Sequence, residues 1–206
     1  MYWIGIDLTS TINIPFILNL NFMKALLLVV ISSIILSSVS QGQAFASLDK
    51  SPMDKAYFPN NFAHDRKAGD EAVIRVTYSR PQKGSREVFG KLVPWKKVWR
   101  VGANEATEIK FYKDVEIGGK KVKAGTYSLF AIPDEKMWTI ILNSDMDYWG
   151  AYSYKESNDV VRFMATPMTN ATPLENFTIQ FKSMGAKQGV MQFAWDTTVA
   201  EVPFSY

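Results

Sequence analysis

From Glu71 onward, apolar and polar residues alternate in the way that a half-buried β-strand requires. Ala72, Ile74, Val76 and Tyr78 fall on one face of a period-two pattern. Arg75 and Thr77 fall on the other face, where only Val73 is apolar. Such alternation predicts a strand with one face against a core. Short runs with strand character recur along the rest of the chain, at Lys97–Val101, Thr107–Tyr112, Val115–Ile117, Lys121–Lys123, Thr126–Ile132, Met137–Asn143, Val160–Ala165, Phe177–Lys182, Val190–Trp195 and Val199–Phe204.

Turn residues separate these runs at short intervals. The pair Gly118-Gly119 predicts a tight hairpin, because both central positions of such a turn need a positive φ. A second hairpin is predicted at Pro133-Asp134-Glu135. Helical turns are expected at most at Phe89–Lys96 and Asp147–Lys155. The pattern therefore predicts an all-β fold, an antiparallel β-sandwich or jelly-roll-like domain with about nine or ten short strands and little helix.

The chain length and the change of pattern set the expected domain limits. A chain of 206 residues has room for one core. Residues 69–206 are predicted to form a single β-sandwich domain. The preceding segment, 47–68, is polar, contains prolines and shows no sustained strand or helix period, so it is interpreted as a lead-in.

Residues 23–46 have the order of parts found in a secretory signal peptide. Lys24 supplies the positive charge, an apolar run extends through Leu36, and Ala44-Phe45-Ala46 matches the small-x-small pattern before a cut ahead of Ser47. A cut after Ala44 is the alternative cleavage site. We therefore expect an exported protein, periplasmic or extracellular.

The segment before this leader lacks the charge that should head a signal peptide. Residues 1–22 contain no Lys or Arg, so we expect them to be an upstream extension and Met23 to be the true start. The alternative is an uncleaved N-terminal anchor, although the apolar run is short for the roughly 20 residues that a membrane span needs. The mature chain is expected to have no transmembrane span.

Composition excludes several classes of function. The chain has no cysteine, which excludes disulfides, thiolate metal sites and thiol nucleophiles. Its 23 basic and 20 acidic residues give a net charge of +3, too small an excess to indicate a nucleic-acid partner. No Gly-x-Ser-x-Gly or His-Glu-x-x-His motif is present. We therefore expect no catalytic residues, no metal and no cofactor, and these observations favour a protein that is not an enzyme.

Six blocks of sequence carry a family resemblance. They are Thr77–Pro81, Phe89–Trp95, Trp99–Thr107, Ala124–Phe130, Trp138–Ile141 and Trp149–Tyr152. In these blocks the chain resembles a bacterial family known as a domain of unknown function, DUF2911. The resemblance runs from about residue 68 to Asp196, and it implies an exported bacterial domain. It brings no activity and no site residues with it.

The densest set of polar residues predicts a small-ligand site. Arg100 and Glu105 flank the small turn Gly102-Ala103, which would bring a guanidinium and a carboxylate together. The alternative is an Arg–Glu pair that ties this turn to a neighbouring strand. The polar members of the predicted site are Ser79, Arg80, Arg100, Asn104, Glu105 and Thr107.

Aromatic residues extend this site. Trp99 and Trp138 lie within strand patterns and are predicted to be core, whereas Trp149 and Tyr152 lie in an irregular stretch beside a glycine and are predicted at the surface. Flat rings of this kind can stack on sugar faces while polar side chains bind the hydroxyl groups. We therefore include Trp149 and Tyr152 in the predicted ligand-binding site.

Three functions remain open at this stage. The first is a non-catalytic exported module that binds a carbohydrate or another small polar ligand. The second is a structural or assembly protein of the cell envelope, which would use the basic and aromatic stretch Arg80–Arg100 against a protein partner or a lipid surface. The third is a hydrolase built on carboxylates such as Glu105 and Asp145.

Overall fold

The alternation after Glu71 forms strand β2 (Ile74–Ser79), in which Ile74, Val76 and Tyr78 are buried while Arg75 and Thr77 are half-buried. The computed structural model describes residues 23–24 and 45–206. The predicted upstream extension, 1–22, lies outside the described residues, as does nearly all of the predicted signal peptide, 23–46.

The larger of two sheets has six strands in the order β1-β2-β3-β6-β7-β8, and every neighbouring pair is antiparallel. Most of its members lie within one or two residues of a predicted strand, as alternation between a buried and a solvated face should give. Besides β2, the members are β1 (Met53–Phe58), β3 (Thr107–Phe111), β6 (Gly125–Ile132), β7 (Trp138–Asn143) and β8 (Asp159–Ala165).

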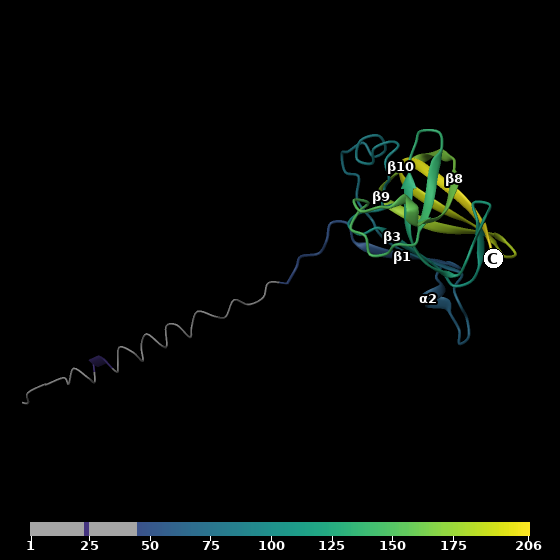
Figure 1. Ribbon diagram of the computed structural model, residues 1–206, viewed down its shortest axis with the longest axis horizontal. Coiled ribbons are helices and arrows are strands. Elements are labelled where there is room, and N and C mark those ends of the chain that lie inside the picture. The colour runs from purple at the N-terminus through teal and green to yellow at the C-terminus, as the bar shows by residue number, and fades with distance from the viewer. Residues whose placement is uncertain (1–22, 25–44) are drawn as a thin grey trace, which may run out of the picture. The chain divides into compact units, whose positions relative to one another are not determined.

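The second sheet has four strands in the order β5-β4-β10-β9, and its pairs are also antiparallel. Its long members, which have 19 and 18 residues, run side by side as the green-yellow pair in Figure 1. The prediction of uniformly short strands is wrong here, because a register irregularity around Asp196 lets one strand continue through two predicted runs. The four strands are β4 (Val115–Ile117), β5 (Lys120–Val122), β9 (Pro167–Gly185) and β10 (Gln188–Ser205).

The ten strands of the described part confirm an all-β sandwich with little helix. Both predicted hairpins are present, and Gly118 and Gly119 have φ values of 56° and 73°. The helices found are short, α2 (Phe62–Asp65) and the 3-10 turn η1 (Glu156–Asn158). Among residues 23–24 and 45–206, no helix has the length and apolar character to cross a membrane.

Three local predictions between β2 and η1 are wrong. Phe89–Lys96 and Asp147–Lys155 are not helical but form turns, the first of them closed by the hydrogen bond from the Val93 amide to the Val88 carbonyl (2.8 Å). Proline within the first segment cannot donate a helical hydrogen bond. The predicted strand Lys97–Val101 is reduced to a single bridge between Trp99 and Ala131.

The lead-in contributes an edge strand that its sequence pattern does not reveal. Strand β1 pairs with β2 from Met53–Ser79 to Phe58–Ile74, and only Phe58 of β1 is fully buried. An edge strand of this kind is held by backbone hydrogen bonds and needs no apolar alternation. Residues 48–206 accordingly form one compact unit, so the ordered domain includes most of the lead-in.

An aromatic cluster joins the two sheets near one end of the domain. Trp138 of β7, Phe177 of β9 and Trp195 of β10 are at most 2 % exposed. Trp99 packs against all three, with its ring centroid 5.1 Å from that of Phe177 and 6.3 Å from that of Trp195. The segment between β2 and β3 therefore has one end anchored in the core, while its other turns form loops beside β9 and β10 (Figure 1).

Candidate functional site

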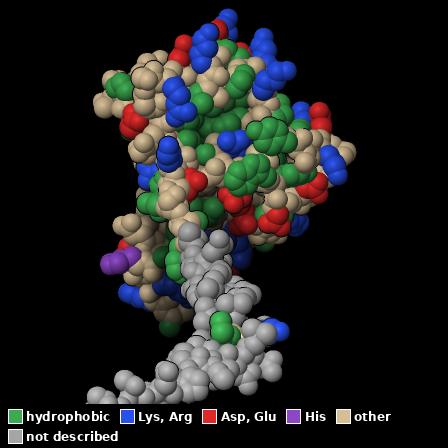
Figure 2. All heavy atoms as spheres, turned by 90° about the vertical axis from the view of Figure 1, so that its left-hand side faces the viewer, with side chains coloured by type: hydrophobic (Ala, Val, Ile, Leu, Met, Phe, Trp, Pro, Cys, Tyr) green, Lys and Arg blue, Asp and Glu red, His purple; other side chains and the backbone are tan. Residues whose placement is uncertain are grey.

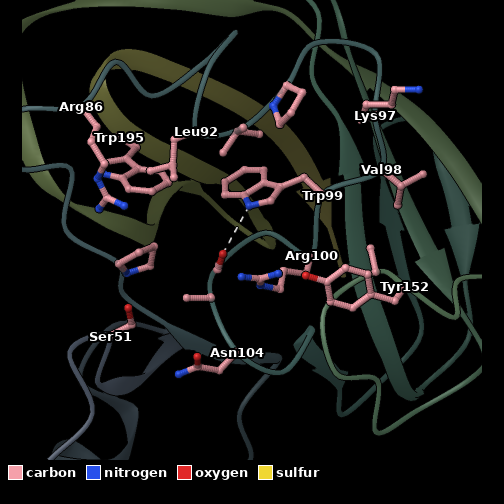
Figure 3. A pocket seen from close by; sticks show the side chains of 16 residues that line it. Ser51, Arg86, Leu92, Lys97, Val98, Trp99, Arg100, Asn104, Tyr152 and Trp195 are labelled. Atoms are coloured by element: carbon pink, nitrogen blue, oxygen red, sulfur yellow. Dashed lines mark hydrogen bonds between the residues drawn. The ribbon is translucent and has the colours of Figure 1, made fainter.

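A cleft of about 480 Å³ lies where the segment between β2 and β3 meets the loop after β7. Its floor is formed by Trp99 and Trp195, which are nearly buried and also belong to the aromatic cluster. Its rim carries Leu92 and the strongly exposed ring of Tyr152 (Figure 3). Volumes of roughly 300–1,000 Å³ are usual for small-ligand sites.

One wall of the cleft is a turn held in an unusual conformation. Val101 has a φ of 56° although it is β-branched, and Asn104 has a φ of 58°. Such a backbone persists only where surrounding contacts fix it. Those contacts are the hydrogen bond from the Thr107 hydroxyl to the Val101 carbonyl (2.6 Å) and the one from the Trp99 indole to the Gly102 carbonyl (3.3 Å), drawn as a dashed line in Figure 3.

The opposite wall, residues 149–152, is tied to this turn through the backbone. The Gly150 amide donates to the Asn104 carbonyl (2.9 Å), and the Ala106 amide donates to the Tyr148 carbonyl (2.9 Å). A side chain at Gly150 would come within 3.3 Å of Nη1 of Arg100, so this glycine leaves room for the guanidinium. The two walls therefore hold Arg100 between them.

Behind the second wall, a half-buried polar network fixes the loop after β7. The Asp145 carboxylate accepts hydrogen bonds from the Tyr148 hydroxyl (2.6 Å) and the Asn158 amide (2.6 Å), which hold the pKa of Asp145 below its ordinary value. Burial, together with the hydrogen bond to Asp145, raises the pKa of Tyr148 to about 12. Because these groups hydrogen-bond to one another, Asp145 stabilises the conformation of the loop.

The charge of the cleft has one sign. Its lining includes Arg86, Lys97 and Arg100 and contains no Asp or Glu. Arg86 is partly used within its own turn, since it donates to the carbonyls of Gln82 and Lys83. Lys97 points away from the cleft in Figure 3.

Arg100 differs from these two cations. Its Nε is buried and has no hydrogen-bond partner among the described residues. No ion pair found in that part of the chain involves its guanidinium. The Nε is closed off, so a ligand in the cleft would meet this guanidinium through its Nη groups, which no described ion pair occupies.

The structure brings together three of the eight predicted site residues. Arg100, Asn104 and Tyr152 line the cleft. Ser79 and Thr107 are buried, and Thr107 supports the turn from below.

Arg80, Glu105 and Trp149 do not line the cleft. Arg80 turns toward β9 and β1, where it binds the Phe177 carbonyl, the Thr178 hydroxyl and Asp54. Glu105 and Trp149 are exposed and face each other only through a backbone bridge.

The alternative of an Arg100–Glu105 pair that ties the turn down is wrong for the described structure, since no such ion pair forms there and Glu105 is exposed. The division of the tryptophans is confirmed. Trp99 and Trp138 are buried, and Trp149 is 62 % exposed.

The aromatic residues of the stretch Arg80–Arg100 lie mostly inside the domain. Phe89 and Trp99 are buried, and Trp95 is half-buried and stacked on Phe89. The basic residues of this stretch are therefore not interleaved with exposed rings. Figure 2 shows a face on which apolar side chains lie among basic and acidic ones. Phe89 and Trp99 do not contribute to such a surface, because both are buried.

The residues of the cleft that the sequence pattern missed include Ser51, Arg86, Leu92 and Trp195. They come from the lead-in, from two turns of one loop and from β10, which meet only after the sheets pack. No local signal marks them. Within the described residues, no group of three or more His, Asp or Glu side chains is placed to hold a metal ion.

Comparison with known proteins identifies a family and nothing more specific. A family model described as a protein of unknown function, DUF2911, matches residues 60–204. No curated protein and no solved structure gives a significant match to the chain.

Proposed function

Since the chain belongs to the DUF2911 family, for which no function is known, we propose a role from the cleft itself. The role is that of a non-catalytic module that binds a small polar ligand, with carbohydrates as the first class to test. The observation that carries this proposal is the Arg100 side chain, a hydrogen-bond donor between the two walls whose Nε has no partner in the described part of the protein.

The surroundings of Arg100 support binding rather than catalysis. No carboxylate lines the cleft, and the two carboxylates considered for hydrolysis are elsewhere, Glu105 on the surface and Asp145 within the loop network. Glycoside hydrolysis needs two carboxyl groups on either side of the scissile bond. The cleft offers donors and flat apolar surface instead.

Tyr152 gives the proposal its carbohydrate direction. Its side chain is 83 % exposed at the rim, and Figure 3 shows its ring beside Arg100 with the hydroxyl on the side of that residue. An exposed ring next to hydrogen-bond donors is the arrangement that stacks a sugar face and binds its hydroxyl groups. Asn104 adds an amide that can both donate and accept.

The test is a thermal-shift and calorimetric screen of purified protein against a panel of oligosaccharides. Binding should be lost or greatly weakened by Tyr152→Ala, because the ring is the exposed surface of the cleft. Trp149→Ala is the matched control, since this ring is exposed on the same loop but does not line the cleft. A folded protein that binds no member of the panel, or a Tyr152→Ala variant that binds as well as the parent, would contradict the proposal.

We also propose that the chain is exported, with the signal in residues 23–46. The support is the order of a basic residue, an apolar run and a small-x-small site in the sequence. Expression in a bacterial host followed by N-terminal sequencing should give a periplasmic or secreted chain that begins at Ser47. A chain that stays in the cytoplasm or keeps its residues 23–46 would refute export by this signal.

A further inference from the structure

We propose that the ligand is an acidic sugar, whose carboxylate is bound by the guanidinium of Arg100 while its ring lies against Tyr152. This inference rests on the proposed function and specifies the chemistry of the ligand. The charge of the lining carries it. Three basic residues and no acidic one line the cleft, although the chain as a whole carries a net charge of only +3.

The geometry around Arg100 explains why a carboxylate fits better than a neutral hydroxyl. A guanidinium presents a planar fork of donors that matches the two oxygens of a carboxylate. Other arginines of this domain already have such a partner, as Arg80 has in Asp54 (2.9 Å) and Arg162 in Asp159 (2.7 Å). Arg100 lies beside Gly150 of the opposite wall, but the described residues give it no carboxylate.

The turn that carries Arg100 is fixed before any ligand arrives. Val101, next in the chain, has its left-handed backbone locked by the Thr107 hydroxyl, and the Thr107 amide donates to the Arg100 carbonyl (3.1 Å). Strained backbone held by neighbouring contacts is concentrated at binding and catalytic sites. Here the strain lies directly beside the unpartnered guanidinium.

The other basic residues add a favourable field without forming the pocket for the carboxylate. Arg86 keeps part of its guanidinium on its own turn, and Lys97 points outward. Their charges act at longer range and should attract an anion in a way that salt screens. Arg100 alone should therefore decide between an acidic sugar and its neutral counterpart.

The experiment compares matched pairs of trisaccharides by isothermal titration calorimetry. The pairs are glucuronate with glucose, galacturonate with galactose, and mannuronate with mannose, so that each differs only at C6. We expect at least one acidic trisaccharide to bind and its neutral counterpart to bind at least about tenfold more weakly. Affinity for the acidic member should fall as salt rises.

Three variants assign the effect to Arg100. Arg100→Gln should remove most of the preference for the acidic member, and Arg100→Lys should retain part of it, since lysine keeps the charge but loses the fork. Ala151→Glu places a carboxylate in the lining and should repel the acidic sugar while leaving the fold intact. Lys136→Gln, on the exposed turn between β6 and β7, makes the same change of charge outside the cleft and should have no effect.

The possible results separate this inference from the proposed function. Equal binding of acidic and neutral members, lost in Tyr152→Ala, would overturn the inference and keep the carbohydrate module. Binding of acidic members that Arg100→Gln leaves unchanged would also overturn the inference. Binding of neither kind by the folded protein would overturn both.

Discussion

Replacing Thr107 by valine tests whether its hydroxyl holds the turn of the cleft. Thr107 is fully buried, and its hydroxyl donates to the Val101 carbonyl at 2.6 Å. Valine has nearly the same shape, so Thr107→Val removes the hydrogen bond and leaves a buried carbonyl without this donor. Such a loss costs about 1–3 kcal/mol of the free energy of unfolding. At about 3 °C per kcal/mol for a domain of this size, the melting midpoint should fall by about 3–9 °C.

The assay is urea and thermal denaturation, followed by tryptophan fluorescence and circular dichroism on the chain beginning at Ser47. Thr107→Ser is the matched control, because it keeps the hydroxyl and loses only a methyl group, which should cost about 1 kcal/mol. If the valine variant is as stable as the parent, or if serine is the more harmful change, the Thr107 hydroxyl does not hold the turn. A valine variant that folds but loses ligand affinity would support the role of the turn in placing Arg100.

Two further predictions concern the turn at Gly118 and the ionisation of Tyr154. Gly118→Ala should lower the melting midpoint of the domain more than Gly119→Ala does. Both glycines have a positive φ, which costs about 1 kcal/mol for alanine. A side chain at Gly118 would in addition come within 2.5 Å of the Phe163 ring, whereas nothing lies within 4 Å at Gly119. Equal losses would show that the contact with Phe163 is not tight. Burial and the hydrogen bond to Asp159 raise the pKa of Tyr154 to about 12 from 10.0. The neutral Tyr154 hydroxyl therefore contributes fully to the free energy of unfolding below pH 10, and this contribution is lost as the pH rises to about 12. Denaturation between pH 9 and 12 should show this loss in the parent, and Tyr154→Phe should lack that part of it; an identical pH dependence in both would refute the raised pKa.

The fold could be predicted from the sequence where local pattern and tertiary environment agree. β2 buries the face that its alternation defines, and Gly118-Gly119 turns where positive φ is required. β1 could not be predicted, since an edge strand binds through its backbone and only one of its side chains, that of Phe58, is buried. The length of β10 could not be predicted either, because the irregularity at Asp196 resembles a turn in the sequence.

Residues of the cleft could be predicted from the sequence only where they lie close together in the chain. Residues close together in sequence, such as Arg100 and Asn104, remain neighbours in the cleft. Arg80 follows the same polar pattern but finds its partners on β1 and β9, which are far away in the chain. Trp195 reaches the cleft from β10 for the same reason. Which long-range partner a side chain meets is decided by sheet packing, and the alternation of polar and apolar residues does not encode it.

The floor of the cleft is also part of the core, which constrains how the protein can diversify. Trp99 contacts Phe89, Trp138 and Phe177, so a change there alters the binding surface and the junction of the two sheets together. The residues of the rim do not also pack in the core, because Tyr152 projects into solvent and Leu92 is 38 % exposed. Substitutions at the rim can therefore change ligand specificity with little loss of stability, whereas substitutions in the floor also lower the free energy of unfolding.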